Sequence, residues 1–309
     1  MIEARVPDAL KDKVVIVTGA GRGIGRDIAL AMAAEGARVI VNDIGASLNG
    51  QGLDTGPACD VADEITRAGG IALADSSSVS DYDAVQRMID SSLQAFGRID
   101  AVVNNAGILR DRLFHKMTRD EWQAVVDVNL TGVFNVSRAV ADIFRQQESG
   151  SYIHLTSTSG LIGNTGQANY GAAKAGVAAL SRTISIDMKR FNVRSNCIAP
   201  FAFTRMVDSI RTDTPELAAK VEQVRRLEPR QIAPLAVYLA SDLAREVTGQ
   251  VFAVRANELF LMSQPRPLRS VHHSEGWTAA SIAQTAIPAL RHGFYGPDKT
   301  SDVFNWPPI

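Results

Sequence analysis

The sequence predicts an α/β fold: a single doubly wound parallel sheet of about seven strands, followed by a proline-rich C-terminal extension. Short β-branched runs alternate with stretches of helical period, which is typical of β-α-β units. The runs VVIV and VIV are almost continuously apolar, as expected for strands covered on both faces. Glycines such as Gly36 and Gly97 stop several of the helical stretches. Together these patterns favour helices on both sides of one sheet.

The expected elements follow in order along the chain. Strands are predicted at Val14–Thr18, Arg38–Asn42, Ile71–Ala74, Ala101–Asn104, Tyr152–Thr156, Val193–Ala199 and Val251–Val254. Helices are predicted at Ile24–Glu35, Asp60–Ala68, Tyr82–Phe96, Arg119–Phe144, Ala168–Lys189 and Ile232–Leu239.

Composition excludes several classes of protein. The chain has 309 residues, 46% of them hydrophobic, and a formal net charge of −1, which excludes disorder for most of its length. The balanced charge gives no support to a nucleic-acid partner. Two cysteines, Cys59 and Cys197, do not suit a disulfide framework, and the scattered histidines do not predict a metal site. With no long apolar run and no secretory signal pattern, we expect a cytoplasmic protein without membrane insertion.

Two stretches depart from the alternating pattern. Residues 45–58 form a glycine-rich loop where a short turn is expected, and residues 255–309 contain half of the chain's 12 prolines. We therefore predict a dinucleotide-binding domain over residues 10–254. The C-terminal extension, residues 255–309, is expected to be ordered and to pack over the substrate cleft or a neighbouring subunit, because it is rich in aromatic and aliphatic residues.

A glycine-rich turn links the first predicted strand to the first helix. Its glycines allow the backbone to approach a pyrophosphate, and the helix N-terminus offers free N–H groups to that anion. The predicted cofactor residues here are Gly19, Gly21, Arg22, Gly23, Ile24 and Gly25. Asp43, at the end of the second strand, would bond a ribose 2′-hydroxyl and repel a 2′-phosphate, which favours NAD over NADP. Arg22 weakly favours NADP, because a basic residue in this turn could meet a 2′-phosphate. The alternative interpretation of the glycines is a tight turn that binds no ligand.

The order of motifs resembles the short-chain dehydrogenase/reductase family. The glycines are spaced as T-G-x-x-x-G-I-G, and Asn104-Asn105-Ala106-Gly107, Asn129, Ser157 and Tyr170-x-x-x-Lys174 follow in the family order over roughly residues 10–254. The resemblance implies a Rossmann-type fold and a secondary alcohol as substrate. A second Y-x-x-x-K, starting at Tyr295, contains Pro297 and so cannot form a helical pair.

The resemblance also implies the role of each site residue. Tyr170 would take the substrate's hydroxyl proton, Ser157 would hold the substrate oxygen, and Lys174 would lower the pKa of the phenol, helped by the oxidised nicotinamide, while bonding its ribose. Asn129 would anchor a water that links Lys174 to solvent. The further cofactor contacts are expected at Ser77, Asn105, Ala106, Gly107, Pro200 and Thr204.

Several segments are similar to one branch of the family, the (3R)-hydroxyacyl-CoA dehydrogenase unit of multifunctional enzymes type 2, also called 17β-hydroxysteroid dehydrogenase type 4. These are residues 42–45, 107–112, 166–170, 198–206 and 275–277. Departures are Phe201 after Pro200, where the family has glycine, Ser77 in place of an aspartate, and Arg255-Ala256-Asn257 at the domain's end.

This branch implies an acyl-CoA thioester or a steroid as the small-molecule substrate. The expected apolar wall is Leu109, Leu113, Phe114, Leu161, Ile162, Phe201 and Phe203. Residues 206–230 would form a lid whose balanced charges fit a solvated helix better than a clamp for CoA phosphates. An NADPH-dependent 3-oxoacyl reductase and a non-catalytic NAD-binding sensor or scaffold are the alternatives. Family habit implies a homodimer or homotetramer through residues 119–144 and 168–189.

Overall fold

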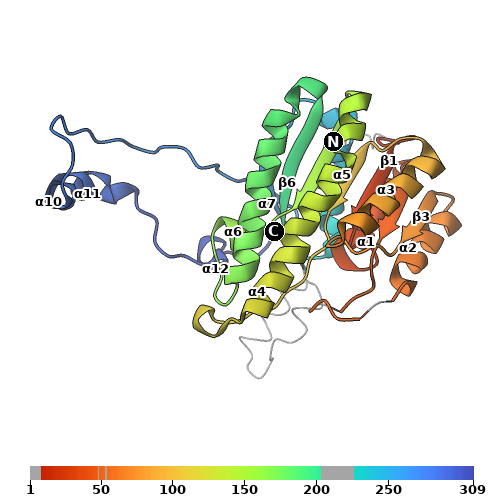
Figure 1. The fold of residues 1–309 in the computed structure, drawn as a ribbon, viewed down its shortest axis with the longest axis horizontal. Helices are drawn as coiled ribbons and strands as arrows, with labels where there is room; N and C mark the ends of the chain where they lie inside the picture. Colours follow the sequence, from red (N-terminus) through yellow and green to blue (C-terminus); the bar gives the residue numbers. More distant parts are fainter. Residues whose placement is uncertain (1–7, 48, 53, 203–225) are drawn as a thin grey trace.

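The computed structural model of the chain describes residues 8–47, 49–52, 54–202 and 226–309. Within them, one eight-stranded sheet runs in the order β3-β2-β1-β4-β5-β6-β7-β8 (Figure 1). Its strands are β1 (Val14–Thr18), β2 (Arg38–Asn42), β3 (Ile71–Asp75), β4 (Ala101–Asn104), β5 (Gly150–Leu155), β6 (Val193–Phe201), β7 (Val251–Arg255) and β8 (Glu258–Leu261). β1 to β7 are parallel, and β8 pairs antiparallel with β7. The doubly wound parallel sheet predicted from the sequence is confirmed.

Helices cover both faces of the sheet. They are α1 (Gly23–Ala34), α2 (Gly56–Arg67), α3 (Tyr82–Phe96), α4 (Arg119–Val126), α5 (Gly132–Gln147), α6 (Thr158–Leu161), α7 (Ala168–Asp187), α9 (Ala233–Ala240), α10 (Ala279–Ser281), α11 (Ile287–Leu290) and α12 (Thr300–Val303). Two π-helical turns, η2 (Asp127–Thr131) and η6 (Ile282–Ala286), join α4 to α5 and α10 to α11. Short 3₁₀ turns are η1 (Phe114–Lys116), η3 (Lys189–Phe191), η4 (Pro229–Gln231), η5 (Asp242–Ala244) and η7 (Arg291–Gly293).

Alternating strand residues build a core on each face. Val15 and Val17 of β1 pack with Ile28 of α1 and with residues of α2 and α9. Val14 and Ile16 point to the other face, where α3 and α5 supply the partners. α7 continues this second layer. Since β1 is buried along its whole length, the central strand carries apolar residues on both sides.

The order in which successive strands are added to the sheet reverses between β1 and β4. β1 pairs with β2 on one side and with β4 on the other, so the loops after β1 and β4 diverge and leave room at the carboxyl edge of the sheet. Ligands of open α/β sheets bind at such a switch point. Every predicted catalytic residue among the described ones follows a strand at this edge or lies on a helix beside it.

Two elements differ from the sequence prediction. The single helix expected over residues 119–144 is interrupted by the π-turn η2, which buries Asn129. An eighth strand, β8, was not predicted; its residues Glu258–Leu261 alternate between half-buried and exposed, and it closes the edge of β7 as a hairpin. The sheet thus continues past residue 254, into the range assigned to the extension.

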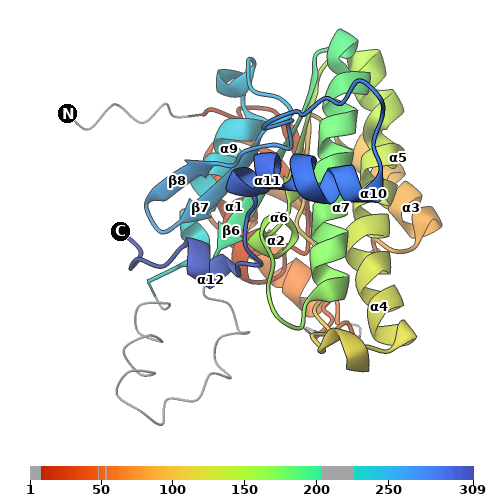
Figure 2. The same cartoon turned by 90° about the vertical axis from the view of Figure 1, so that its left-hand side faces the viewer.

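Parts of the C-terminal extension contact the domain, and its packing over the substrate cleft or a neighbouring subunit stays a prediction. Arg182 of α7 donates a hydrogen bond to the Gln264 side chain, and the Thr300 N–H donates one to the Gly163 carbonyl. Between these two anchors the chain runs out from the sheet, and α10 and α11 lie away from the body of the protein (Figures 1 and 2). The end of the chain returns to the domain, where Phe304 packs 4.8 Å from Phe201, centroid to centroid.

Candidate active site

The glycine-rich turn after β1 has the shape of an anion-binding loop. Gly19 and Gly23 have φ of 63° and 55°, in the left-handed region that favours glycine. A side chain on Gly25 would collide with the Gly19 carbonyl, so the turn is also tightly packed. Beside Gly23, by contrast, no described atom lies within 4 Å of a Cβ position. Arg22 is the N-cap of α1 but gives no side-chain cap, so the first N–H groups of this helix remain available to a ligand.

Asp43 lies directly against this turn. Its Oδ2 accepts a hydrogen bond from the Gly21 N–H at 2.8 Å, and its Oδ1 accepts one from the Gly45 N–H at 2.7 Å. The carboxylate is therefore fixed at the end of β2, where an acid of this fold meets the adenosine ribose. Arg22 points to a different acid, Asp54, at 4.0 Å, and its side chain is largely exposed.

Hydrogen bonds of the Thr18 and Asn105 side chains hold the glycine-rich turn against the end of β4. The Asn105 side chain donates to the carbonyls of Thr18 at 3.0 Å and Gly19 at 2.9 Å. The Thr18 hydroxyl accepts from the N–H groups of Asn105 and Ala106, both at 3.1 Å. A Cβ on Gly19 would lie 2.8 Å from the Ala106 Cα, so the two loops touch. Asn105 and Ala106 thus hold the shape of the turn in this structure.

The remaining predicted cofactor residues follow β3 and β6. Ser77 is held by Asp75, whose carboxylate accepts from the Ser77 N–H at 2.8 Å and from the Asn42 side chain at 2.7 Å. Pro200 lies in β6 opposite Val254 of β7. Thr204 lies outside the described residues, as do Phe203 and most of the predicted lid.

Ser157 and Tyr170 meet beside the end of β5. Ser157 caps α6, where its Oγ accepts from the Ser159 N–H at 3.1 Å. Ser157 lies beside the phenol of Tyr170, near the start of α7. Burial raises the pKa of Tyr170 to about 12, and the adjacent Ser157 side chain opposes that rise. The structure therefore brings the predicted hydroxyl pair together.

Lys174 lies one helical turn after Tyr170 and is almost fully buried, with 3% of its surface exposed. Its Nζ lies 5.6 Å from the centroid of the Tyr170 ring and donates a 2.7 Å hydrogen bond to the Leu155 carbonyl. Burial lowers the pKa of Lys174 to about 8. The sequence predicts that Lys174, with oxidised nicotinamide nearby, lowers the pKa of Tyr170. In the structure the pKa of Tyr170 is raised instead, because removing the phenol from water disfavours its anion.

Asn129 lies in the π-turn η2 and is fully buried. Its amide nitrogen donates to the carbonyls of Ile108 and Val125, at 2.9 and 3.0 Å. Its Oδ1 is buried without a hydrogen-bond partner among the described residues. An orphaned buried acceptor of this kind is a place for an ordered water. A Cβ on Gly107 would lie 2.5 Å from this oxygen, so the absence of a side chain at Gly107 leaves room for the Asn129 amide.

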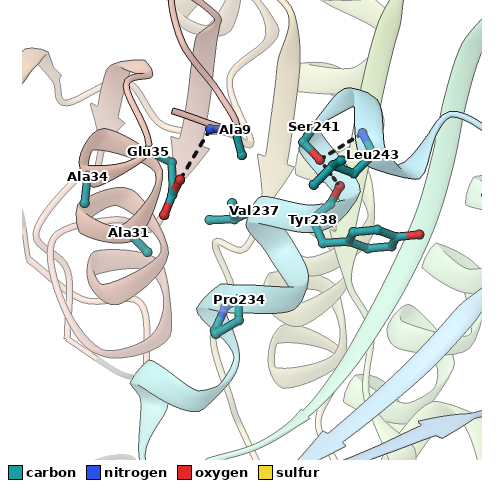
Figure 3. A pocket seen from close by; sticks show the side chains of 9 residues that line it. All are labelled: Ala9, Ala31, Ala34, Glu35, Pro234, Val237, Tyr238, Ser241 and Leu243. Carbon is teal, nitrogen blue, oxygen red and sulfur yellow. Dashed lines mark hydrogen bonds between the residues drawn. The ribbon is translucent and has the colours of Figure 1, made fainter. Parts of the chain in front are cut away.

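The apolar wall expected for the substrate is only partly assembled. Leu113 and Phe114 are 46% and 79% exposed at the mouth, whereas Phe201 is covered by Phe304 of the extension. A groove of about 370 Å³ lies elsewhere, between Ala9 before β1, the C-terminal half of α1 and residues of α9 (Figure 3). None of Ser157, Tyr170 and Lys174 lines it.

Comparisons with known proteins agree with this geometry. The model of a family described as enoyl-(acyl carrier protein) reductase matches residues 19–256, which include the glycine-rich turn, Ser157, Tyr170 and Lys174. The chain belongs to the short-chain dehydrogenase/reductase family. Members of this family are oxidoreductases acting on hydroxyl groups, and so is this short-chain dehydrogenase/reductase.

Its similar relatives include proteins of the predicted branch. The mouse peroxisomal multifunctional enzyme type 2 is 41% identical over 84% of the chain, which spans 34% of that enzyme's length. The hydroxyacyl-CoA dehydrogenase ChsB1 of Mycobacterium tuberculosis is 37% identical over 94% of the chain and 90% of its own length. A solved short-chain dehydrogenase from Mycobacterium avium is 38% identical with a TM-score of 0.81, covering 94% of this chain and 98% of its own.

Sequence reasoning missed several residues that shape this site. Asp111 and Gln167 form a hydrogen bond beside Tyr170, and Ser159 connects them to Ser157. The Leu155 carbonyl, which holds Lys174, was not predicted either. Asp111 and Gln167 do lie inside the segments that resemble the family branch, which is the signal that could have identified them. Among the described residues, no helix is long and apolar enough to cross a membrane, and no group of three or more metal-ligand side chains gathers.

Proposed function

We propose that this chain is an NAD-dependent dehydrogenase that interconverts a (3R)-hydroxyacyl-CoA, or a related hydroxysteroid, and the corresponding ketone. The observation that carries the proposal is the placement of the buried Lys174 beside the Tyr170 ring, 5.6 Å from its centroid, with Ser157 next to the phenol, at the same edge as the glycine-rich turn. A phenol, a hydroxyl and an ammonium in this order can accept a proton, hold an oxygen and stabilise an anion.

The residues of the glycine-rich turn fit a dinucleotide. The uncapped N-terminus of α1 and the open space beside Gly23 would receive the pyrophosphate, and Asp43 would accept from the adenosine ribose. When bound, NAD supplies the hydride acceptor. Asp43 supports NAD over NADP because a fixed carboxylate repels a 2′-phosphate. Two solved relatives, a Mycobacterium avium carveol dehydrogenase and a 7α-hydroxysteroid dehydrogenase, are described as complexes with NAD and NADH.

Tyr170 acts as the general base in the oxidation direction. Its pKa of about 12 in the ligand-free structure is too high for a base at neutral pH, so a further positive charge or a change in solvation must lower it. Lys174 is placed to contribute, since its ammonium is 5.6 Å from the phenol ring and its pKa of about 8 leaves it mostly protonated at pH 7.

Ser157 and Asn129 complete the proton path. Ser157 Oγ, held by the Ser159 N–H, can turn its own hydrogen toward a substrate oxygen and stabilise charge that develops there. The unpaired Oδ1 of Asn129 is suited to an ordered water that passes protons between Lys174 and solvent.

Support for the substrate class comes from relatives and from the mouth of the site. Relatives named hydratase-dehydrogenase-epimerase, multifunctional enzyme type 2 and hydroxyacyl-CoA dehydrogenase share about 40% identity with the chain. The exposed Leu113 and Phe114 offer an apolar surface to an acyl chain or a sterol.

A spectrophotometric screen tests this assignment. Purified protein is assayed at one pH with (3R)-hydroxyacyl-CoA thioesters, their (3S) isomers and free hydroxysteroids, each with NAD and with NADP. The proposal expects NADH formation with a (3R) thioester or a hydroxysteroid. Turnover confined to NADP, or to none of these substrates, would contradict it.

A second candidate is an NADPH-dependent 3-oxoacyl reductase. It is favoured by one relative, the 3-oxoacyl-[acyl-carrier-protein] reductase of Synechocystis, which is 41% identical over 80% of the chain and 96% of its own length. Initial rates of 3-oxoacyl thioester reduction with NADPH and NADH separate the two. A non-catalytic NAD-binding role is the third, and is disfavoured by the assembled Ser157, Tyr170 and Lys174.

Assembly and location are further proposals. Phe134 on α5 and Ile186 on α7 are 49% and 69% exposed, which supports a homodimer or homotetramer through these helices. A cytoplasmic location rests on the two free cysteines. The names of several relatives state a peroxisomal location for those proteins.

A further inference from the structure

A chain of polar side chains leads from the mouth of the site to Ser157. Asp111 Oδ2 accepts a 2.8 Å hydrogen bond from the Gln167 amide nitrogen. The Gln167 oxygen accepts one at 2.7 Å from the Ser159 hydroxyl, and Ser159 Oγ in turn accepts one at 3.2 Å from the Ser157 hydroxyl. Asn164 also donates to Ser159 Oγ, at 2.9 Å.

The direction of each hydrogen bond in this chain follows from its first member. An ionised carboxylate only accepts, so the nitrogen of Gln167 must face Asp111 and its oxygen must face Ser159. The single hydroxyl hydrogen of Ser159 is then used on Gln167, and Ser159 Oγ can only accept from Ser157. Ser157 Oγ accepts from the Ser159 N–H, and its own hydrogen points to Ser159 Oγ, so a substrate oxygen would have to take that hydrogen from Ser159.

The loop that carries Asp111 is built to stay in place. The neighbouring Arg112 forms a β-bridge with Gln167, and its N–H donates to the Gly166 carbonyl at 2.8 Å. Asn169, fully buried, donates to the carbonyls of Arg110 and Glu121, both at 3.0 Å. The backbone on both sides of the Asp111–Gln167 contact is therefore held by hydrogen bonds, and the contact itself is exposed to solvent.

We propose that Asp111 is a positioning residue for this reaction: it fixes the Gln167 amide, and through Ser159 it fixes the hydrogen-bond direction at Ser157. The inference rests on the proposed roles of Ser157 and Tyr170. The carboxylate acts on the phenol through space, and the pKa of Tyr170 is raised by it, after the larger effect of burial.

The charged and polar groups around Tyr170 come from three elements. Lys174 lies on the same helix, Asp111 comes from the loop after β4, and the polar Ser157 comes from the end of β5. The basic neighbours of Asp111 are directed elsewhere: Arg110 donates to the Asn49 carbonyl, and Arg112 pairs with Glu121 at 2.9 Å. Among the described residues, Asp111 is thus the acid whose charge raises the pKa of Tyr170.

Two variants separate the charge from the hydrogen-bond chain. Asp111→Asn removes the charge but keeps an oxygen that can accept from Gln167. Gln167→Met keeps the charge and the side-chain length but breaks the chain. The matched control is Asp90→Asn, since Asp90 accepts a 3.1 Å hydrogen bond from Gln86 on α3, far along the sequence from the site.

The measurements are the pH profile of kcat for alcohol oxidation and the titration of Tyr170 by ¹³C NMR with Cζ-labelled tyrosine. The Tyr170→Phe variant identifies its signal among the 5 tyrosines. Asp111→Asn should lower the pKa of Tyr170 by on the order of half a pH unit or more and move the oxidation profile to lower pH, with a plateau kcat within about twofold. Gln167→Met should lower the plateau kcat about tenfold and leave the Tyr170 pKa within about 0.2 unit, because one hydrogen bond is lost and no charge.

Wild-type behaviour of both variants would overturn the proposal, as would an Asp111→Asn variant that loses kcat without any shift of the Tyr170 pKa. The NMR titration needs no turnover, so it tests Asp111 even if the substrate assignment fails. Absence of dehydrogenase activity in the wild-type protein would instead contradict the proposed function itself.

Discussion

The Lys174 ammonium lies 5.6 Å from the ring centroid of Tyr170 but donates its hydrogen bond to the Leu155 carbonyl. The charge that should stabilise the phenolate is therefore near the phenol and bonded to the end of β5 at the same time. Burial lowers the pKa of Lys174 to about 8 and raises that of Tyr170 to about 12, so burial shifts each group toward its neutral form. Burial of the Lys174 ammonium therefore lowers the stability of the fold. A positive charge bound nearby would lower the pKa of Tyr170.

The cost at Lys174 predicts a trade-off between stability and activity. Lys174→Met should abolish turnover yet raise the free energy of unfolding at pH 7 by about 1–2 kcal/mol. The lysine's depressed pKa costs about 3 kcal/mol there, and the loss of a donor to the Leu155 carbonyl offsets part of the gain. Denaturant unfolding followed by circular dichroism measures the difference.

The pH dependence of that difference checks its origin. Below pH 8 the penalty is fully present. Between pH 8 and 10.5 the unfolded lysine still holds a proton that the folded one has released, so wild-type stability rises with pH relative to the variant. The gap between the two proteins should therefore narrow as pH increases from 8 to 10. A constant gap would show that Lys174 is not the source.

Asp43 should control the choice of cofactor. Asp43→Asn keeps one acceptor oxygen but loses the charge and one of the two hydrogen bonds, from the Gly21 N–H or from the Gly45 N–H. We expect the Kd for NAD to rise about tenfold or more and the preference over NADP to shrink, since a charged hydrogen bond is lost. Fluorescence titration with both cofactors measures this. Asp63→Asn, an exposed acid on α2, is the control and should bind as the wild type does.

Gly107 should be sensitive to a single added methyl group. In Gly107→Ala the new Cβ would lie 2.5 Å from Asn129 Oδ1, so the amide must move and its bonds to Ile108 and Val125 must weaken. We expect the free energy of unfolding to fall by about 1–3 kcal/mol and kcat to fall about tenfold or more. Gly293→Ala is the control, because nothing lies within 4 Å of its Cβ position. Equal behaviour of the two variants would argue against a buried role for Asn129.

The end of the extension should contribute to the substrate side of the domain. Trp306 donates to Glu258 at 2.7 Å, and Phe304 packs on both Phe201 and Phe260. Deleting residues 265–309 should lower the melting temperature and reduce kcat/KM for the thioester, because Phe201 then loses its cover. Thermal unfolding and steady-state kinetics give the two readouts. A truncated protein with unchanged stability, activity and assembly would refute this role.

Regular patterning made the strands and the outer helices predictable from sequence. Short, almost continuously apolar runs predict strands such as β1 and β6, and the i, i+4 spacing predicts that Tyr170 and Lys174 share one face of α7. The π-turn at Asn129 and the edge strand β8 have no such periodic signal. The Asp111–Gln167 contact joins two loops, and the tertiary fold rather than local sequence brings them together. Likewise, burial of Lys174 and Tyr170, which sets their pKa values, is a property of packing.

The most direct test of the catalytic account is turnover by Tyr170→Phe. The variant keeps the ring and its packing and removes only the phenolic hydroxyl, which lies beside Ser157. With a (3R)-hydroxyacyl-CoA and NAD, the account predicts a loss of kcat of at least about a thousandfold, because a general base is removed, while the Kd for NAD stays within a few-fold. Activity equal to that of the wild type would contradict the role given to Tyr170 and with it the proposed mechanism.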